Sequence, residues 1–521
     1  MRTHMRKSFI LLSATFISLY ASAQVPEDAL RVSWTTPSGT ARNQAIGGVM
    51  TSLGGDISAN FINPAGIGLY RTSELVLSPG FSFYNNKSTY RDTKTSQTGN
   101  GFVLGTSGFV FGINDPYRPN RSSAFSIAVN RSASFNNHIT YTGTNNFSSF
   151  SEAYAAEIAN SGLTLDDALN SNTISFPARM SIYTYLTDTL STLQGGTEVV
   201  GTPLRYAYER DTAFLLNQNN DVKTSGGITE IAFSFAGNKN DKFYWGASVG
   251  LPILNYERTS ILTETDAGTN SQNYFKSSTL TERFTSKGIG LNLKIGLIFK
   301  PVDNIRLGAA IHSPTIYGLK DTYDATMETD LENYNAPTSV NVATLNNGGI
   351  PQYNYDQNSP WRFLASASYV FRETSDTRQQ KGFISADIEY VTYSTNKFSS
   401  ADPNSIDNQS YYNSLNSTIK NIYKGALNAK IGGELKFNTI MARAGFAYYG
   451  NPYRDQPFKG NRMYISGGLG YRNKGYFIDV AYVHNITKDV NFPYRLSDKA
   501  NTYADVKGTG GNVVLTVGLK F

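Results

Sequence analysis

The sequence lacks cysteine altogether and has only four histidines among its 521 residues. The absence of cysteine excludes disulfide frameworks, zinc–cysteine sites, iron–sulfur clusters and thiol catalysis. Charged residues make up only 17% of the chain. No run of about 18 or more apolar residues follows the N-terminus, which excludes a bundle of membrane helices.

What the chain has in abundance is aromatic residues and glycine: 34 Tyr, 30 Phe and 46 Gly. This mixture is typical of many half-buried strands separated by turns. It does not fit disorder or a coiled coil. The length alone allows two to four ordinary domains or one large β-architecture.

The N-terminus has the form of an export signal. Three basic residues precede an apolar run from Phe9 to Tyr20, and Ala21-Ser22-Ala23 follows as an A-x-A cleavage site. We therefore predict a signal peptide over residues 1–23 and a mature chain that starts at Gln24. The segment holds three of the 46 basic residues and none of the 40 acidic ones, so the net charge falls from +6 to +3. So small a charge gives no electrostatic case for a nucleic-acid partner.

From residue 73 onward, apolar residues alternate with small or polar ones in segment after segment, which predicts strands. The predicted strands cover 73–84, 101–114, 124–141, 226–237, 242–258, 280–300, 305–318, 360–371, 381–393, 424–437, 440–450, 462–472, 476–485 and 510–521. The connections between them alternate between long and short. Long loops on one side, tight turns on the other and an even strand number are typical of an outer-membrane barrel.

The fold class that this pattern predicts is all-β, a 14-stranded antiparallel transmembrane β-barrel over residues 73–521 in the bacterial outer membrane. A secreted sandwich array or propeller is the alternative, since soluble strands also alternate. That alternative does not predict the alternation of loops. Phe521 closes an alternating last strand and resembles the signal read by the barrel-assembly machinery, which we expect as a partner.

Residues 24–72 do not alternate and are rich in glycine. They are too few to form a separate domain with its own core. Small residues suit a segment packed inside a barrel, where the polar wall supplies hydrogen-bond partners. We predict a hatch in the lumen.

Ala41 to Leu69, with the motif Asn63-Pro64-Ala65, resembles the hatch of the FadL/TodX-type outer-membrane transporters of hydrophobic compounds. The strand–turn–strand from Gly290 to Pro314, ending in Ser-Pro, is similar to a hairpin of the same family. The resemblance implies a 14-stranded barrel with a luminal hatch. It also implies passive uptake of long-chain fatty acids or aromatic compounds, with lateral release into the membrane. In this interpretation Asn63, Pro64, Ala65 and Gly66 hold the hatch and gate the channel.

The largest predicted external loop, 142–225, carries apolar side chains at helical spacing: Phe147, Phe150, Tyr154 and Ile158. Apolar side chains in an external loop need a partner. One interpretation packs them onto the mouth of the barrel. The other makes them an apolar groove that captures a hydrophobic ligand.

The third predicted strand has an anomaly. If Phe125, Ile127, Val129, Ala133 and Phe135 face lipid, Arg131 falls on the same face, at a cost of roughly 2–4 kcal/mol. A bulge or kink near Asn130 and Arg131 would turn the arginine inward. The family resemblance implies a lateral exit at such a kink. A face assignment wrong by one residue is the alternative.

Two alternative functions remain open: a haem or haemin receptor, and a general aqueous porin or surface barrel. His138 and His484 lie near predicted external strand ends, but no two histidines have paired spacing. No catalytic constellation is evident, so we expect neither an enzyme nor a cofactor or metal site. The expected partners are a hydrophobic small molecule, outer-membrane lipid and lipopolysaccharide, and no nucleic acid.

Overall fold

The computed structural model describes residues 28–114, 117–118, 120–191, 197–210, 212–268, 270, 272–372, 381–402, 406–454 and 460–521. The predicted signal peptide, residues 1–23, and the first residues of the predicted hatch lie outside the described residues.

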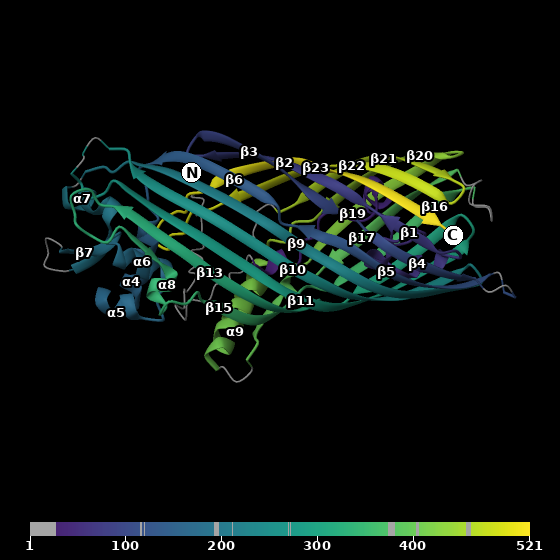
Figure 1. Cartoon of the computed structure of the whole chain (residues 1–521), viewed down its shortest axis with the longest axis horizontal. Coiled ribbons are helices and arrows are strands. Elements are labelled where there is room, and N and C mark those ends of the chain that lie inside the picture. The colour runs from purple at the N-terminus through teal and green to yellow at the C-terminus, as the bar shows by residue number, and fades with distance from the viewer. Residues whose placement is uncertain are drawn as a thin grey trace, which may run out of the picture.

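Within the described residues, fourteen antiparallel wall strands form a closed barrel (Figure 1). The last strand pairs with the first, for example Lys520 with Glu74, and so closes the ring. All fourteen strands predicted from the sequence are present. In chain order the wall comprises β1 (Glu74–Leu77) with β2 (Pro79–Tyr90), β3 (Thr93–Leu104) with β4 (Ser107–Asn114), β5 (Arg121–Ser134) with β6 (Asn137–Asn145), β9 (Leu216–Lys239), β10 (Phe243–Asp266), β11 (Ser277–Val302), β12 (Ile305–His312) with β13 (Ile316–Asp330), β15 (Gln352–Asn358) with β16 (Arg362–Phe371), β17 (Gly382–Val391) with β18 (Lys397–Ser400), β19 (Ala426–Phe437), β20 (Ile440–Tyr449), β21 (Arg462–Asn473), β22 (Tyr476–Asn491) and β23 (Ala504–Lys520).

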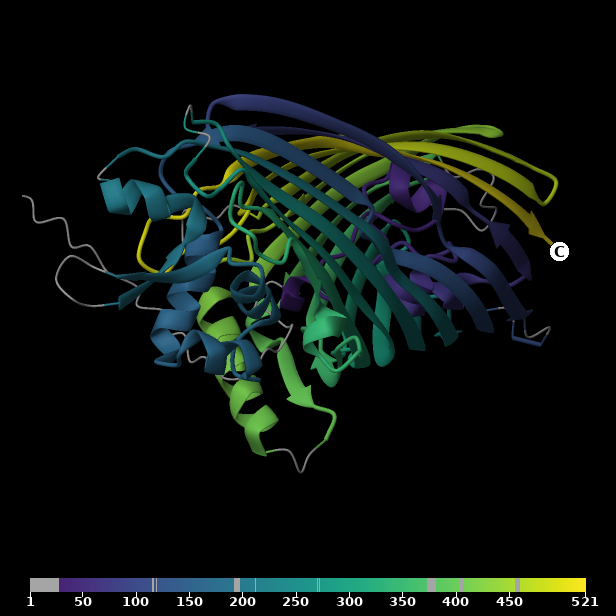
Figure 2. The ribbon, with the colours of Figure 1, turned by 60° about the vertical axis from the view of Figure 1, so that its left-hand side comes forward.

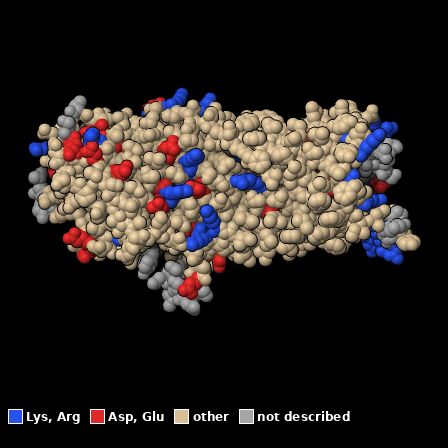
Figure 3. Space-filling view, viewed as in Figure 1, with Lys and Arg blue, Asp and Glu red and all other residues tan. Residues whose placement is uncertain are grey.

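The outer face of the barrel carries an apolar belt. In β11 the side chains of Ile289, Leu291, Leu293, Ile295 and Leu297 are all exposed, while the residues between them are small or polar. Figure 3 shows a wide band free of charged side chains between the right-hand end of the barrel and the charges farther left. Such a belt faces lipid in an outer-membrane barrel. No helix in the described part of the chain is long and apolar enough to cross a membrane.

Several strands continue far beyond the belt, and here the predicted bounds are wrong. The predicted loop 85–100 is the extension of β2 and β3, which turn at Arg91-Asp92. The predicted loop 259–279 is mostly the extension of β10 and β11, and the loop 142–225 shrinks to 146–215 because β6 and β9 extend into it. Outside the membrane neither face of a strand meets lipid, so these extensions lose the apolar alternation that marks a strand in the sequence.

The rim opposite the tight turns is uneven. β9, β10 and β11 have 24, 24 and 26 residues, whereas β20 has 10. Helices cover the mouth at the tall side, and one long helix leans out beside it (Figures 1 and 2). The extramembrane elements are α4 (Ser151–Ser161), α5 (Leu165–Asn170), α6 (Phe176–Tyr183), β7 (Thr187–Ser191), β8 (Thr197–Gly201), α7 (Thr202–Arg210), β14 (Ser339–Asn341), α8 (Val342–Leu345), η2 (Tyr393–Thr395) and α9 (Ile406–Ile422).

The N-terminal segment lies inside the ring of strands (Figure 2), as predicted for a hatch. It contains α1 (Asp28–Arg31), α2 (Ala41–Ala45), α3 (Ala59–Ile62) and the 3-10 helix η1 (Pro64–Leu69). α2 contacts β20 to β23 and η1 contacts β5 and β9 to β11, so the hatch reaches opposite sides of the wall. Its apolar residues share one buried cluster with inward side chains of the barrel.

A bulge interrupts the third wall strand. The register of β5 against β9 shifts between Arg131 and Ala133. An extra residue reverses which side the following side chains face. Ala133 is therefore buried inside, with Phe135 packed against the same interior cluster. The prediction that these two residues face lipid is wrong.

Candidate functional site

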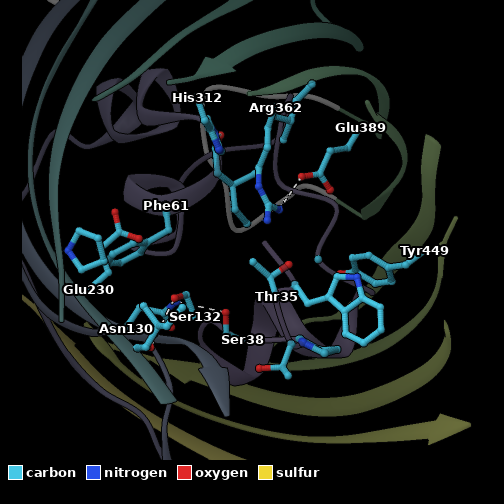
Figure 4. Close-up of a pocket in the computed structure, with 18 of the residues that line it drawn as sticks. Thr35, Ser38, Phe61, Asn130, Ser132, Glu230, His312, Arg362, Glu389 and Tyr449 are labelled. Atoms are coloured by element: carbon cyan, nitrogen blue, oxygen red, sulfur yellow. Dashed lines mark hydrogen bonds and ion pairs between the residues drawn. The ribbon is translucent and has the colours of Figure 1, made fainter. Parts of the chain in front are cut away.

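A cavity of about 160 Å³ lies in the lumen, between residues 32–38 of the hatch and the barrel wall (Figure 4). Part of its lining is apolar or aromatic, including Trp34, Phe61, Tyr317 and Tyr449. Toward the side of the long loops, Leu30 of α1 belongs to a buried cluster with residues of β15, β18 and α9. We call this luminal cavity the chamber.

Paired charges form the rest of the lining. Lys294 forms a buried ion pair with Glu230 and also donates to Asn292 Oδ1 at 2.7 Å. Across the chamber, Glu389 accepts from Arg362 at 3.0 Å and lies 3.6 Å from Lys430 Nζ. Each of these charges has an opposite partner, which is the condition for keeping ions in a space with little water.

The Asn63-Pro64-Ala65-Gly66 motif fixes the hatch to the wall. Asn63 caps η1 by accepting from the Ala65 N–H at 3.1 Å. Its amide donates to the Thr51 carbonyl at 2.6 Å and reaches wall carbonyls of Leu297 at 3.1 Å and Ala309 at 3.3 Å. One side chain thus joins two parts of the hatch to β11 and β12.

The hatch rests on glycines of the wall. A Cβ atom added to Gly296 would approach Asn63 within 3.0 Å, and one added to Gly308 would meet the Thr51 backbone. Similar contacts place Gly246 against Pro64, and Gly432 and Gly445 against residues 46–47. Real Cβ atoms essentially never come so close. The fit therefore requires a wall with no side chain at these positions.

Beneath α2 the hatch meets a buried ionic cluster. Arg443 donates to Glu434 and to Asp479, each at 2.6 Å, and all three side chains are at most 1% exposed. Arg42 of the hatch adds a contact of 3.3 Å to Glu434. The cluster joins β19, β20 and β22 to the hatch.

Beside the chamber, the backbone ladder of the wall is broken. The ladder between β4 and β5 ends at Ser107 and Val129. Beyond that point, within the described residues, β3 pairs only with β2, and β6 only with β9. The edges of β3 and β6 are linked by side chains instead, for example Gln97 with His138 at 3.1 Å.

Residues 36–38 of the hatch bind to the inner edge of this break. The Thr36 N–H donates to the Ser132 carbonyl at 3.1 Å, at the bulge itself. Asn130 donates to Ser38 Oγ at 3.1 Å and accepts from Thr106 Oγ1 at 3.1 Å. Arg131 precedes the bulge and keeps the outward face of Phe125 and Ile127, so the expectation that the bulge turns the arginine inward is wrong. Its guanidinium donates to the Gly226 carbonyl. The sequence identified Asn130 and Arg131 but missed Thr36 and Ser38, because nothing in their local pattern marks a contact with a distant strand.

The four external apolar residues predicted from the sequence lie in or beside α4, in the external segment 146–215. We call this segment the cap. Phe150 and Ile158 are fully buried, Tyr154 packs against both of their clusters, and Phe147 is 42% exposed. Glu264, near the end of β10 and outside the belt, accepts from the Phe150 N–H at 2.9 Å. Burial raises the pKa of Glu264 to about 7 from 4.5.

The three histidines of the described chain have separate environments. His312 contacts the Ile62 carbonyl at 2.7 Å in the lumen, His138 contacts Asp221 at 2.9 Å, and His484 contacts Tyr482 at 3.1 Å. No group of three or more His, Asp or Glu in the described residues is arranged to hold a metal ion.

A closed barrel with an apolar belt and a hatch in its lumen defines a class: the protein is a plugged β-barrel of the bacterial outer membrane. No family model matches the sequence, and no curated protein matches it in sequence. A FadL homologue of Pseudomonas aeruginosa aligns with a TM-score of 0.52 and 14% identity, over 94% of this chain and 100% of that one. The toluene transporters TodX of Pseudomonas putida and TbuX of Ralstonia pickettii align with TM-scores of 0.48 and 0.47, each at 14% identity, over 93% of this chain and 99% of theirs. The fold is therefore that of the FadL-type barrels, as the sequence resemblance predicted.

Proposed function

We propose that the protein is a passive channel that takes hydrophobic small molecules across the outer membrane and releases them sideways into the bilayer. The observation that carries the proposal is the position of residues 32–38. They form one side of the luminal chamber, and residues 36–38 bind the inner edge of the broken wall. A single movement of residues 36–38 would connect chamber and membrane.

The rest of the hatch supports a local movement. From residue 42 onward, the hatch is fixed by wall glycines, by Asn63 and by the Arg42 contact with Glu434. Residues 36–38 are fixed at the break by neutral hydrogen bonds, each worth about 0.5–1.5 kcal/mol net. Residues 33–35 are held more firmly, because Arg362 donates to the Ser33 carbonyl and Arg462 donates to the Thr35 carbonyl at 3.1 Å. The weaker attachment is the one next to the break, so the gate is the segment 36–38 rather than the whole hatch.

Paired cysteines test this assignment, since the chain has no cysteine of its own. Ser38→Cys with Asn130→Cys allows a short bifunctional thiol reagent to tie the gate to the wall. Ser52→Cys with Ser366→Cys is the matched control, because these hydroxyls lie 2.6 Å apart between the fixed part of the hatch and β16.

The assay is uptake of a labelled long-chain fatty acid, and separately of toluene, by vesicles that contain the protein. We expect cross-linking of the first pair to block uptake and cross-linking of the control pair to leave it unchanged. Equal uptake by both cross-linked proteins would contradict the gate. Absence of uptake by the unmodified protein would contradict the channel itself.

A further inference from the structure

Three lysines lie in one row across the outer face of the barrel. Lys507 of β23 is the direct cross-strand partner of Lys87 on β2 and of Lys488 on β22. All three are exposed. Lys87 shares its face with Phe81 and Phe83, and Lys507 shares its face with Val513 and Leu515, which belong to the apolar belt. The lysines therefore point outward.

The row costs free energy in the isolated protein. Neighbouring strands are about 4.8 Å apart, so the three Cβ atoms are near neighbours, and like charges directly opposite are destabilising. In the described part of the chain, no acidic side chain forms an ion pair with any of the three. The next row of the same face contains Asp505 on β23, Thr89 on β2 and Lys94 on β3. Thr89 is the direct cross-strand partner of both Asp505 and Lys94. Asp489 follows Lys488 but belongs by strand alternation to the other face of β22. Asp505 is matched by a fourth lysine, so the patch keeps its positive charge.

The height of the row matches the headgroups of the outer leaflet. A tilted strand crosses the hydrocarbon in about 9–11 residues. Counted from the outward Leu75 at the tight-turn end, a crossing ends near Asn85, and Lys87 is two residues farther out. The tight turns lie on the inner side of the membrane, so the lysines lie at the outer interface.

A groove of about 490 Å³ adjoins the row on its membrane side. Phe83 and Tyr482 form one wall, with their rings stacked at 6.1 Å and 7°. Asn85, Thr98 and Thr509 lie between these rings and the lysines. An occupant of the whole site therefore has an apolar part beside the rings, polar groups above it and negative charge at the lysines.

We propose that this face binds lipopolysaccharide through the phosphate groups of its lipid anchor. A phosphorylated glycolipid presents acyl chain, sugar and phosphate in the same order as the aromatic, polar and lysine rows. Lysine binds phosphate as a strong point charge. Neutralisation by phosphate also removes the repulsion within the row. The site is on the outer face of the wall, so it is independent of the ligand that the lumen carries.

The test uses the full-length barrel purified in a neutral detergent. The variant Lys87→Gln/Lys488→Gln/Lys507→Gln removes the row, and Lys239→Gln/Lys242→Gln/Lys474→Gln removes three exposed lysines at the tight-turn end. Binding of diphosphorylated lipid A, dephosphorylated lipid A and inorganic phosphate is measured for each protein by native mass spectrometry.

We expect the row variant to bind diphosphorylated lipid A at least about tenfold more weakly than the wild type, while the control variant is unchanged. Dephosphorylated lipid A should bind all three proteins weakly. Equal binding by the two variants would overturn the site. Inorganic phosphate that binds the wild type as tightly as lipid A would show a simple anion site and overturn the assignment to a lipid. A thermal melt without lipid checks folding, since loss of the row should leave stability equal or higher.

Discussion

The buried cluster beneath the hatch gives the sharpest test of how the hatch is held. Arg443→Met keeps most of the side-chain volume but leaves Glu434 and Asp479 without their shared cation. Both carboxylates are 1% exposed. Removal of one partner from a buried ion pair costs about 3–5 kcal/mol.

Two other arginines reduce the cost. Arg42 Nε lies 3.3 Å from Glu434, and Arg472 lies 3.9 Å from Asp479. Each carboxylate keeps one longer contact with an arginine. We therefore expect Arg443→Met to lower the free energy of unfolding by about 3 kcal/mol, the lower end of the range for a broken buried ion pair. Further replacement by Glu434→Gln and Asp479→Asn should recover most of the loss, because no unpaired carboxylate then remains.

The assay is reversible unfolding of the barrel from vesicles in denaturant, followed by tryptophan fluorescence. Arg283→Met is the matched control: Arg283 also pairs with a carboxylate, Glu257, but its side chain is 61% exposed. That variant should lose less than about 1 kcal/mol. A loss of less than about 0.5 kcal/mol in Arg443→Met would refute the view that this cluster stabilises the folded state.

Two further predictions concern the cap and the hatch. Because burial raises the pKa of Glu264 to about 7 from 4.5, its contribution to cap stability is complete below pH 4.5 and is lost as the pH rises through 7, by up to about 3 kcal/mol. The protection factors of residues 146–191, which compare the observed hydrogen-exchange rate with the intrinsic rate at the same pH, should therefore be lower at pH 8 than at pH 5, and Glu264→Gln should abolish that difference; the same difference in the variant would assign it to another group. Gly296→Ala places a Cβ against Asn63 and should loosen the hatch, which we expect to appear as steady ion conductance in planar bilayers. Gly318→Ala is its control, since the nearest atom there is 3.8 Å away, and equal conductance in both variants would show that the hatch does not depend on this fit.

The sequence was sufficient to predict the strands and the hatch, because both follow from local composition. In β11 every second residue meets lipid, so Ile289 to Leu297 repeat with period two. The hatch was recognisable by the opposite property, a glycine-rich stretch with no period. The extensions of β2, β3, β10 and β11 were not predicted, because strands that meet water on both sides have no comparable pattern.

The site was only partly predictable, because its contacts depend on register. Arg131 signalled an irregular third strand, since a cation is costly at that position. Lys294, between Leu293 and Ile295, is visibly a luminal charge once the alternation is read. That it pairs with Glu230 depends on how β9, β10 and β11 are aligned, which no single segment specifies.

The uneven rim determines the direction from which a molecule can arrive. The ten residues of β20 are about the number that crosses the membrane, so the barrel ends there near the bilayer surface. On the side of β9 to β11, more than twice as many residues raise the wall far above it. A solute that descends vertically meets the tall wall and its helices. If the barrel is the proposed channel, a solute that spreads along the membrane surface reaches the low edge at β20 before the tall wall. Its supply to the lumen is then closer to diffusion in two dimensions than in three.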